Sequence, residues 1–269
     1  MSFGLGLAAL CLAGLGCGGA SSSSGTFTPH TQDVLTVATD AIPSPGFWEG
    51  TAAHPTGGLE YALAQELARR FDLSSVRVTI VPFPRLVAGD LGGADLGLAL
   101  ISPTSEREES LDFSAPYLDA APTIVVRAGT PVPDLQAAQG LRWGVERATT
   151  FVELVEDEIR PADQPTVYET QAELIAALME GRIKAALFDL PSAVAIADRS
   201  RGRLEVAAKL RRPEQIAAAL PKGSSNDQAV DSAMRALVAN GTVSDLLDRW
   251  VGEDAADAER DVPLLRTAG

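Results

Sequence analysis

The sequence predicts an α/β fold of two lobes, and three observations carry this prediction. The chain has 269 residues, of which 46% are hydrophobic and 22% are charged. This composition is globular, and at roughly 150 residues per domain the length suggests about two domains. Short β-prone apolar runs alternate with amphipathic helical segments. The alternation occurs in two similar blocks, the second of which starts near Leu141.

The first block predicts four strands and one long helix. Leu59, Leu63, Leu67 and Phe71 recur every four residues and define one face of a helix. Because the apolar runs are separated by helices, we expect parallel strands that are covered on both faces. The predicted strands are residues 34–39, 76–81, 95–100 and 123–127.

The second block repeats this pattern, and capping boxes mark two helix starts. Thr150 is followed three residues later by Glu153, and Thr170 by Glu173, as in a capping box. The first of these helices is expected to run through residue 158, and the second to end at Gly181. The predicted strands are residues 142–145 and 185–188, and a further helix is expected from Pro191.

The last part of the chain predicts two helices and a tail. A helix capped by Ser225 is expected to run to Asn240 and Gly241, and an amphipathic turn from Ser244 to end near Trp250. Residues 253–269 are charged and aperiodic, so we expect them to form a tail.

Charge and cysteine content exclude several classes of function. The formal net charge is −14, so the molecule repels phosphate backbones and nucleic acid is not expected as a partner. The two cysteines, Cys11 and Cys17, leave no internal disulfide or cysteine-based zinc site in the body of the chain. His30 and His54 are the only histidines and lie in Pro/Thr-containing stretches, which disfavours a nucleophilic triad. No metal or cofactor is expected.

The N-terminus predicts export and a lipid anchor. Residues 1–16 are uncharged and form an apolar run that suits a signal peptide but is too short to span a bilayer. Gly16 and Cys17 resemble the end of a bacterial lipobox, so we expect lipidation at Cys17 and a tether over residues 17–33. The protein would then lie in the periplasm or on the cell surface, in contact with membrane only through the anchor. The alternative is a Cys17 that is buried in an N-terminal core helix.

Polar segments that follow the predicted strands are the candidate site. In open α/β sheets, ligands lie beyond the carboxyl ends of the strands. Residues 101–108 (ISPTSERE) follow such a strand and open a polar helix start, with Ser102, Thr104 and Ser105 as possible caps. The fork of Arg107 at this place suits an anionic carboxylate. An arginine on a solvated surface is the alternative.

Five segments carry a resemblance to a known family. ADLGLALISPTSERE and LDFSAPY, within Ala94 to Tyr117, pair a T-x-E-R motif with an F-S-x-P-Y motif that begins six residues after Arg107. This stretch resembles the family 3 extracellular solute-binding proteins, the amino-acid receptors of ABC importers. VLTVATDAIPSPGFWEG, LRWGVERATTF, GRIKAALFDLPSAVAIA and the closing ALPKGSSNDQAVDSAMRALVANGTVSDLLDRWVG resemble other segments of that family in the same order.

The resemblance implies a fold and a function. The fold is the type II periplasmic-binding-protein fold, two α/β lobes joined by a hinge of two crossing strands near Arg127 and Ala217. Lobe 1 would comprise residues 34–126 and 217–252, and lobe 2 residues 127–216. A monomer would capture a small polar solute, most simply an amino acid, between the lobes. It would deliver this solute to an ABC permease in the membrane and would catalyse no reaction.

The resemblance also implies the role of each candidate residue, and the chemistry of a zwitterion agrees, because it needs one buried cation and one buried anion. Each role has a structural alternative: Thr150 as an N-cap, Asp189 as a cap before Pro191, Asp40 as a partner of loop amides, and the phenylalanines as core. In the implied roles, Arg107 clamps the α-carboxylate, Thr150 contacts it from the other lobe, Asp189 binds the α-ammonium, the Leu100 backbone and the Ser102 hydroxyl take either group, Asp40 faces the ligand, and Phe47 or Phe83 forms a wall.

Departures from the family pattern leave the ligand open. Ala148 stands where the family has the glycine of its G-T-T loop, and Pro43 stands where many relatives have an aromatic residue. Two other functions therefore remain: a ligand-sensing module for a membrane receptor, and an enzyme on the same fold that resembles cyclohexadienyl dehydratase.

Overall fold

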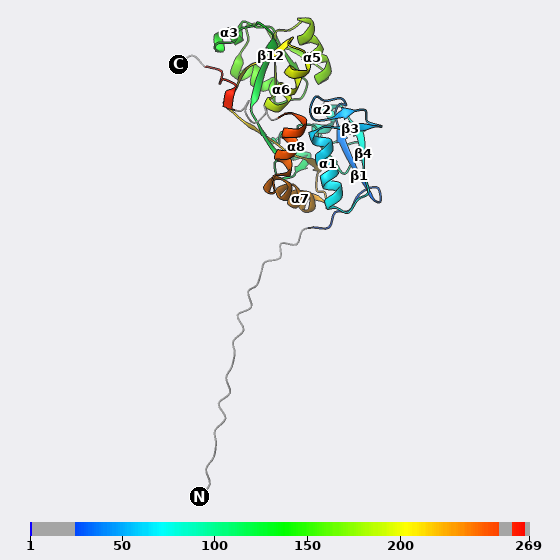
Figure 1. Ribbon diagram of the computed structural model, residues 1–269. Helices are drawn as coiled ribbons and strands as arrows, with labels where there is room; N and C mark the ends of the chain where they lie inside the picture. Colours follow the sequence, from blue (N-terminus) through cyan, green and yellow to red (C-terminus); the bar gives the residue numbers. More distant parts are fainter. Residues whose placement is uncertain (2–24, 253–259, 267–269) are drawn as a thin grey trace.

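Two five-stranded sheets organise the protein, one in each lobe (Figure 1). The computed structural model describes residues 1, 25–252 and 260–266. The predicted signal peptide and Cys17 lie outside the described residues. Within the described residues, no helix is both long enough and apolar enough to cross a membrane.

The first lobe combines segments from both ends of the chain, as the blue and orange ribbons in Figure 1 show. Its strand order is β4-β1-β5-β14-β6. Helices α1, α7 and α8 share one apolar core with Leu35 and Val37 of β1, whereas α2 packs with Ala38 of the same strand in a second core. The elements are β1 (Val34–Thr39), β2 (Glu49–Gly50), β3 (Pro55–Gly57), α1 (Leu59–Arg70), β4 (Ser75–Ile80), α2 (Phe83–Val87), β5 (Leu96–Gly97), η1 (Arg107–Glu109), β6 (Leu111–Phe113), β14 (Ala219–Pro221), α7 (Asp227–Ala239) and α8 (Thr242–Trp250).

The second lobe has strand order β10-β9-β11-β8-β12. Leu174 and Leu178 of α5 pack with Ile196 of α6 in one core, while Trp143 of β9 lies in a separate core with the segment around Val155. The elements are β8 (Pro122–Arg127), α3 (Leu135–Gln139), β9 (Trp143–Glu146), α4 (Phe151–Leu154), η2 (Val155–Ile159, a π-helix), β10 (Thr166–Tyr168), α5 (Gln171–Glu180), β11 (Ala185–Asp189), α6 (Leu190–Arg199) and β12 (Leu204–Lys209).

Each sheet is mixed rather than fully parallel, which corrects the sequence expectation. In the first sheet β4, β1 and β5 are parallel, but β14 is antiparallel to β5. In the second sheet β10, β9 and β11 are parallel, but β8 is antiparallel to β11. Strands β8 and β14 each follow a passage between the lobes, and each runs opposite to the parallel strand beside it. Apolar composition alone does not report strand direction.

The chain passes between the lobes through two paired segments. Strand β7 (Leu118–Ala120) pairs antiparallel with β13 (Glu214–Ile216). Because β8 pairs with β11 and β12, residues 122–126 belong to the second sheet. The predicted lobe boundary after residue 126 is therefore too late. Where the chain passes back from the second lobe to the first, the Ala217 amide donates to the Ile101 carbonyl of the first lobe at 3.0 Å.

Two of the three predicted helix caps are wrong. Thr170 does cap α5, because its hydroxyl oxygen accepts from the Glu173 amide at 3.2 Å. The Thr150 side chain makes no cap bond, and α4 passes after four residues into the π-helix. Helix α7 starts at Asp227 rather than at a capped Ser225. The predicted strand over residues 95–100 is also reduced to Leu96–Gly97.

Part of the predicted tether is packed against the first lobe. Phe27 stacks on Phe71 with ring centroids 4.2 Å apart. The Thr28 amide donates to Asn226 Oδ1 at 2.8 Å, and Asn226 Nδ2 donates back to the Thr28 carbonyl at 2.9 Å. A tether therefore ends before Phe27, because burial of this aromatic ring holds the following residues to the lobe.

Part of the predicted tail is likewise docked, on the second lobe (Figure 1). The Lys209 amide donates to the Pro263 carbonyl at 2.8 Å, and the Leu265 amide donates to the Lys209 carbonyl at 2.8 Å. Leu265 packs against the core that contains Trp143. These contacts extend the edge of the second sheet beside β12, so residues 260–266 are not a free tail.

Candidate ligand-binding cleft

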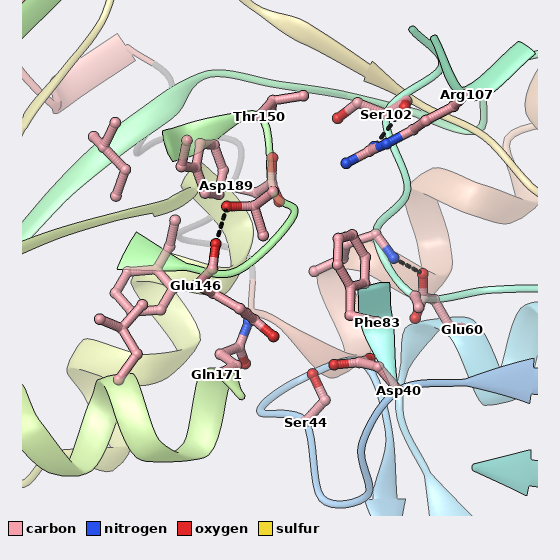
Figure 2. A pocket seen from close by; sticks show the side chains of 17 residues that line it. Asp40, Ser44, Glu60, Phe83, Ser102, Arg107, Glu146, Thr150, Gln171 and Asp189 are labelled. Atoms are coloured by element: carbon pink, nitrogen blue, oxygen red, sulfur yellow. Dashed lines mark hydrogen bonds between the residues drawn. The ribbon is translucent and has the colours of Figure 1, made fainter. Parts of the chain in front are cut away.

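A polar pocket lies between the two lobes at the ends of their strands (Figure 2). Asp40 follows β1 of the first lobe, while Glu146 and Asp189 end β9 and β11 of the second. Its free space is about 40 Å³, which holds about three water molecules. The lobes are closed on one another, so a larger ligand enters only if they separate.

Arg107 spans the two lobes at one end of the pocket. Its guanidinium donates to the Ser102 carbonyl at 2.7 Å in its own lobe and to the Ala148 carbonyl at 2.9 Å in the other. The guanidinium carbon lies 5.5 Å from the centre of the Phe83 ring, a cation–π distance. The side chain is buried, and burial lowers the pKa of Arg107 from its ordinary value. Arg107 is thus a buried cation in a fixed orientation rather than a surface residue.

Asp189 is a buried carboxyl group of the second lobe. It is 6% exposed, and its Oδ1 atom has no hydrogen-bond partner among the described residues. Burial, followed by the charges of Glu214 and Glu60, raises the pKa of Asp189 to about 8. Its side chain makes no helix-cap bond to α6. A buried carboxyl with an unpartnered oxygen is costly unless a donor reaches it, so this residue is suited to a cationic group.

Glu60 is a buried carboxyl group that no sequence pattern marked as a site residue. It accepts hydrogen bonds from Trp48 Nε1 at 2.7 Å, from the Leu100 amide at 2.8 Å and from the Tyr117 hydroxyl. Burial raises the pKa of Glu60 to about 7. These donors give Glu60 a structural task, and they leave the Leu100 carbonyl, not its amide, to meet a ligand. Leu100 takes the left-handed conformation with φ 50°.

Two more carboxyl groups line the pocket: Asp40, which was a predicted site residue, and Glu146, which was not. Glu146 is 7% exposed, and burial together with the nearby charge of Asp40 raises its pKa to about 8. Burial also raises the pKa of Asp40 to about 6. Glu146 is the last residue of β9, so the same strand-end argument that selected Asp40 could have found it.

The hydroxyls of Ser102 and Thr150 converge on a residue of the passage between lobes. Ser102 Oγ donates to Glu214 Oε2 at 2.6 Å, and Thr150 Oγ1 donates to the same oxygen at 2.8 Å. Each hydroxyl has one hydrogen, so toward the pocket both present lone pairs. In this arrangement they accept from an ammonium rather than donate to a carboxylate. Nothing in the sequence pattern pointed to Glu214.

The two candidate phenylalanines differ in their position relative to the pocket. Phe83 lines the pocket beneath Arg107. Phe47 is fully buried in the core of the first lobe and is not among the residues that line the pocket. Of the two, Phe83 is therefore the one placed to form a wall, whereas Phe47 packs in the core that also contains Leu59 and Leu63 of α1.

Pro43 and Ala148, which depart from the family pattern, differ in their relation to the pocket. Pro43 is exposed and does not line the pocket. Ala148 takes a left-handed conformation with φ 62°, and its carbonyl accepts from Arg107 at 2.9 Å. This conformation places the Ala148 Cβ in a strained region that glycine would avoid.

Comparison with known proteins agrees with this architecture. Residues 35–253 match the family of bacterial extracellular solute-binding proteins, family 3. The L-cystine-binding protein of Escherichia coli strain K12 is 24% identical over 200 residues, which cover 73% of this chain and 75% of that protein.

Solved structures show the same two-lobed fold. An amino acid ABC transporter substrate-binding protein from Streptococcus pneumoniae, bound to L-arginine, has a TM-score of 0.72 at 26% identity and covers 81% of this chain and 94% of its own. The arginine-, lysine-, histidine-binding protein of Geobacillus stearothermophilus has a TM-score of 0.71 at 25% identity, with 81% and 95% coverage. This chain therefore belongs to the bacterial extracellular solute-binding proteins of family 3 and has their type II periplasmic-binding-protein fold.

Proposed function

We propose that the cleft captures an α-amino acid outside the cytoplasm and presents it to the permease of an ABC importer. The observation that carries the proposal is the pairing of one buried cation, Arg107, with one buried carboxyl, Asp189, in a pocket between lobes. A zwitterion needs these two charges, since each of its own charged groups must be compensated when water is excluded. The names of the relatives, which bind cystine or arginine, support this ligand class.

Each residue has a role in this proposal. Arg107 binds the α-carboxylate with the guanidinium donors that remain beside its two backbone bonds. Asp189 accepts from the α-ammonium, together with the Leu100 carbonyl and the lone pairs of the Ser102 and Thr150 hydroxyls. Phe83 supports the guanidinium from below. Asp40 faces the ligand from the first lobe.

Ligand binding would favour closure, because only the closed form contacts the ligand from both lobes. The β7 and β13 segments would act as the hinge, and the closed form would dock on the permease. Lipidation at Cys17 would keep a monomeric protein near the membrane. A micromolar dissociation constant, typical of such capture, corresponds to about −8 kcal/mol.

Thermal unfolding of the purified protein against the common L-amino acids tests the proposal. A ligand that binds only the folded state must raise the unfolding midpoint. We expect a rise with at least one amino acid in the wild type and none with the same compound in Arg107→Ala. If no amino acid raises the midpoint of the wild type, the cleft serves a different solute and the proposal is wrong.

A further inference from the structure

The cleft holds more carboxyl groups than the backbone of an amino acid requires. Among the described residues that line it are four carboxyl groups, those of Asp40, Glu60, Glu146 and Asp189, and a single cation, Arg107. A zwitterion pairs with Arg107 through its carboxylate and with one carboxyl group through its ammonium. Three carboxyl groups therefore remain to be explained.

Glu60 is explained by the protein itself. Its carboxylate receives three donors, from Trp48, Leu100 and Tyr117, and these hold the loop that carries Leu100. Asp189 differs, since one oxygen of this almost fully buried side chain has no partner in the described part of the chain. Asp189 thus requires a ligand donor, and only Asp40 and Glu146 are in surplus.

Asp40 and Glu146 approach the cleft from opposite lobes. Figure 2 shows them on the side of the pocket away from Arg107 and Ser102, near the polar side chains of Ser44 and Gln171. Neither makes an ion pair with a lysine, arginine or histidine of the described residues. Glu146 is buried and Asp40 is half-buried, so ionisation of both carboxyl groups in the closed form is costly unless a cation lies between them.

We propose that Asp40 and Glu146 form a subsite for a cationic side chain, so that the ligand is an α-amino acid with a guanidinium or ammonium group at the end of an aliphatic chain. This inference rests on the proposed function. The backbone of the ligand would lie between Arg107 and Asp189, and its side chain would run toward the Asp40 and Glu146 end. Closure would then place the side-chain cation between one carboxylate from each lobe.

The charge balance separates this ligand from related ones. Glutamine and citrulline bring a neutral side chain and leave the carboxyl groups of Asp40 and Glu146 without a counter-ion. A diamine matches the carboxylates but leaves Arg107 without its anion. A dicarboxylic amino acid adds a third negative charge between Asp40 and Glu146. Only a basic amino acid satisfies both ends of the cleft.

The decisive comparison is L-arginine against L-citrulline, measured by isothermal titration calorimetry at pH 8.5. The two compounds have nearly the same shape, but the citrulline side chain is uncharged. L-Lysine and L-glutamine form a second comparison of a charged with a neutral side chain, at different side-chain lengths. We expect arginine or lysine to bind at least about 100-fold more tightly than its neutral counterpart, as loss of a charged hydrogen-bond pair implies.

Glu146→Gln assigns the effect to the subsite. We expect this variant to bind the basic amino acid about 10- to 100-fold more weakly, while its affinity for citrulline and glutamine is unchanged or higher. Glu156→Gln, at an exposed position of the π-helix, removes the same net charge from the protein and should bind like the wild type. Unfolding midpoints of both variants establish that they are folded, and the wild-type comparison needs no variant.

The outcomes separate the inference from the proposed function. If no α-amino acid binds, the proposed function fails. If glutamine or citrulline binds the wild type as tightly as lysine or arginine, the amino-acid function stands and the cationic subsite is wrong. An equal loss of basic and neutral ligands in Glu146→Gln would also overturn the subsite, since it would show that Glu146 only supports the fold.

Discussion

At the scale of single residues, Arg107 is the side chain whose loss the cleft tolerates least. It is buried, its guanidinium bridges the Ser102 and Ala148 carbonyls, and it faces the ring of Phe83. Truncation to alanine removes the one cation among the described residues that line the pocket, and it leaves a ligand carboxylate buried without a partner. We expect Arg107→Ala to weaken amino-acid binding by about 2–5 kcal/mol.

Calorimetric titration measures this loss, and Arg85→Ala provides a control. Arg85 is exposed and pairs with Asp90 on the surface, so its removal should leave binding unchanged. Binding by Arg107→Ala at the wild-type affinity would remove Arg107 from the site, whatever its burial.

Ala148 has a backbone conformation that is unfavourable for a residue with a Cβ atom. Its φ of 62° is one that glycine adopts freely and alanine does not. We expect Ala148→Gly to stabilise the protein by about 0.5–1 kcal/mol, equivalent to about 1–4 °C in the unfolding midpoint. The Ala148 carbonyl still accepts from Arg107, so ligand affinity should change little.

The matched control for this prediction is Ala236→Gly. Ala236 lies within helix α7, where glycine is less favourable than alanine by about 1 kcal/mol. Differential scanning calorimetry should therefore show midpoint shifts of opposite sign for the two variants. A fall in both would mean that Ala148 is not strained.

At the scale of elements, the two predicted capping boxes show what a local motif can and cannot predict. Thr170 and Thr150 stand at the same spacing before a glutamate, but only Thr170 caps its helix. Thr150 lies at the junction of the lobes, and there its hydroxyl donates to Glu214 from a segment 64 residues away. A tertiary partner outside the motif thus replaced the local bond.

Local sequence patterns likewise predict only some of the residues of the ligand-binding cleft. Asp40, Arg107 and Asp189 could be predicted because strand ends and a recognisable motif mark them. Glu214 could not, since its role exists only when the returning segment β13 pairs with β7. The position of Phe47 relative to the pocket could not be predicted for a related reason: a pattern that locates an aromatic residue in a loop does not say which way the loop turns the ring.

Glu214 carries a prediction that belongs to the hinge segments. Its carboxylate accepts from Ser102 of one lobe and Thr150 of the other, so it stabilises the closed arrangement and directs both hydroxyls. We expect Glu214→Ala to increase the radius of gyration of the ligand-free protein in X-ray scattering. We also expect it to weaken ligand binding by about 1.4 kcal/mol, or tenfold.

A double-mutant cycle tests whether Glu214 acts through the hydroxyls. In a Ser102→Ala, Thr150→Val background, the further change Glu214→Ala should have little effect, because its hydrogen-bond partners are already absent. Additive losses would show that Glu214 acts by another route. Gln215→Ala, at the exposed neighbouring position of β13, is the control and should leave both scattering and affinity unchanged.

At the scale of the whole molecule, the closed cleft concentrates carboxyl groups whose pKa values are raised by burial. The raised pKa values are about 8 for Asp189, about 8 for Glu146, about 7 for Glu60 and about 6 for Asp40. A raised pKa means that the folded state favours the protonated form. The resulting contribution to stability is fully present below the unfolded values near pH 4 and is lost as pH rises to about 8.

Other carboxyl groups act in a different pH range. Side-chain hydrogen bonds to basic residues, together with the charges of those residues, lower the pKa values of Asp90, Asp112 and Glu169. The stability that these three groups contribute is therefore lost only as pH falls below about 4. Changes as the pH rises from 5 to 9 therefore report on the cleft together with Asp227, whose pKa is also raised by burial. The charged groups that face Asp189 there are Glu214, Glu60 and Arg107.

We expect the ligand-free protein to lose stability between pH 5 and pH 9, seen as a fall in the unfolding midpoint, because the raised pKa values of the cleft carboxyl groups lie in this range. Asp189→Asn should flatten this profile, because its amide does not ionise. A bound cationic group lowers the pKa of the carboxyl it contacts, so the midpoint rise caused by ligand should grow from pH 5 to pH 8, with protons released on binding. Calorimetry in two buffers of different ionisation enthalpy measures that release. A ligand-free midpoint that is flat or rises over this range in the wild type would show that the cleft carboxyl groups are ionised and solvated, and that the lobes of the ligand-free protein stand open in solution.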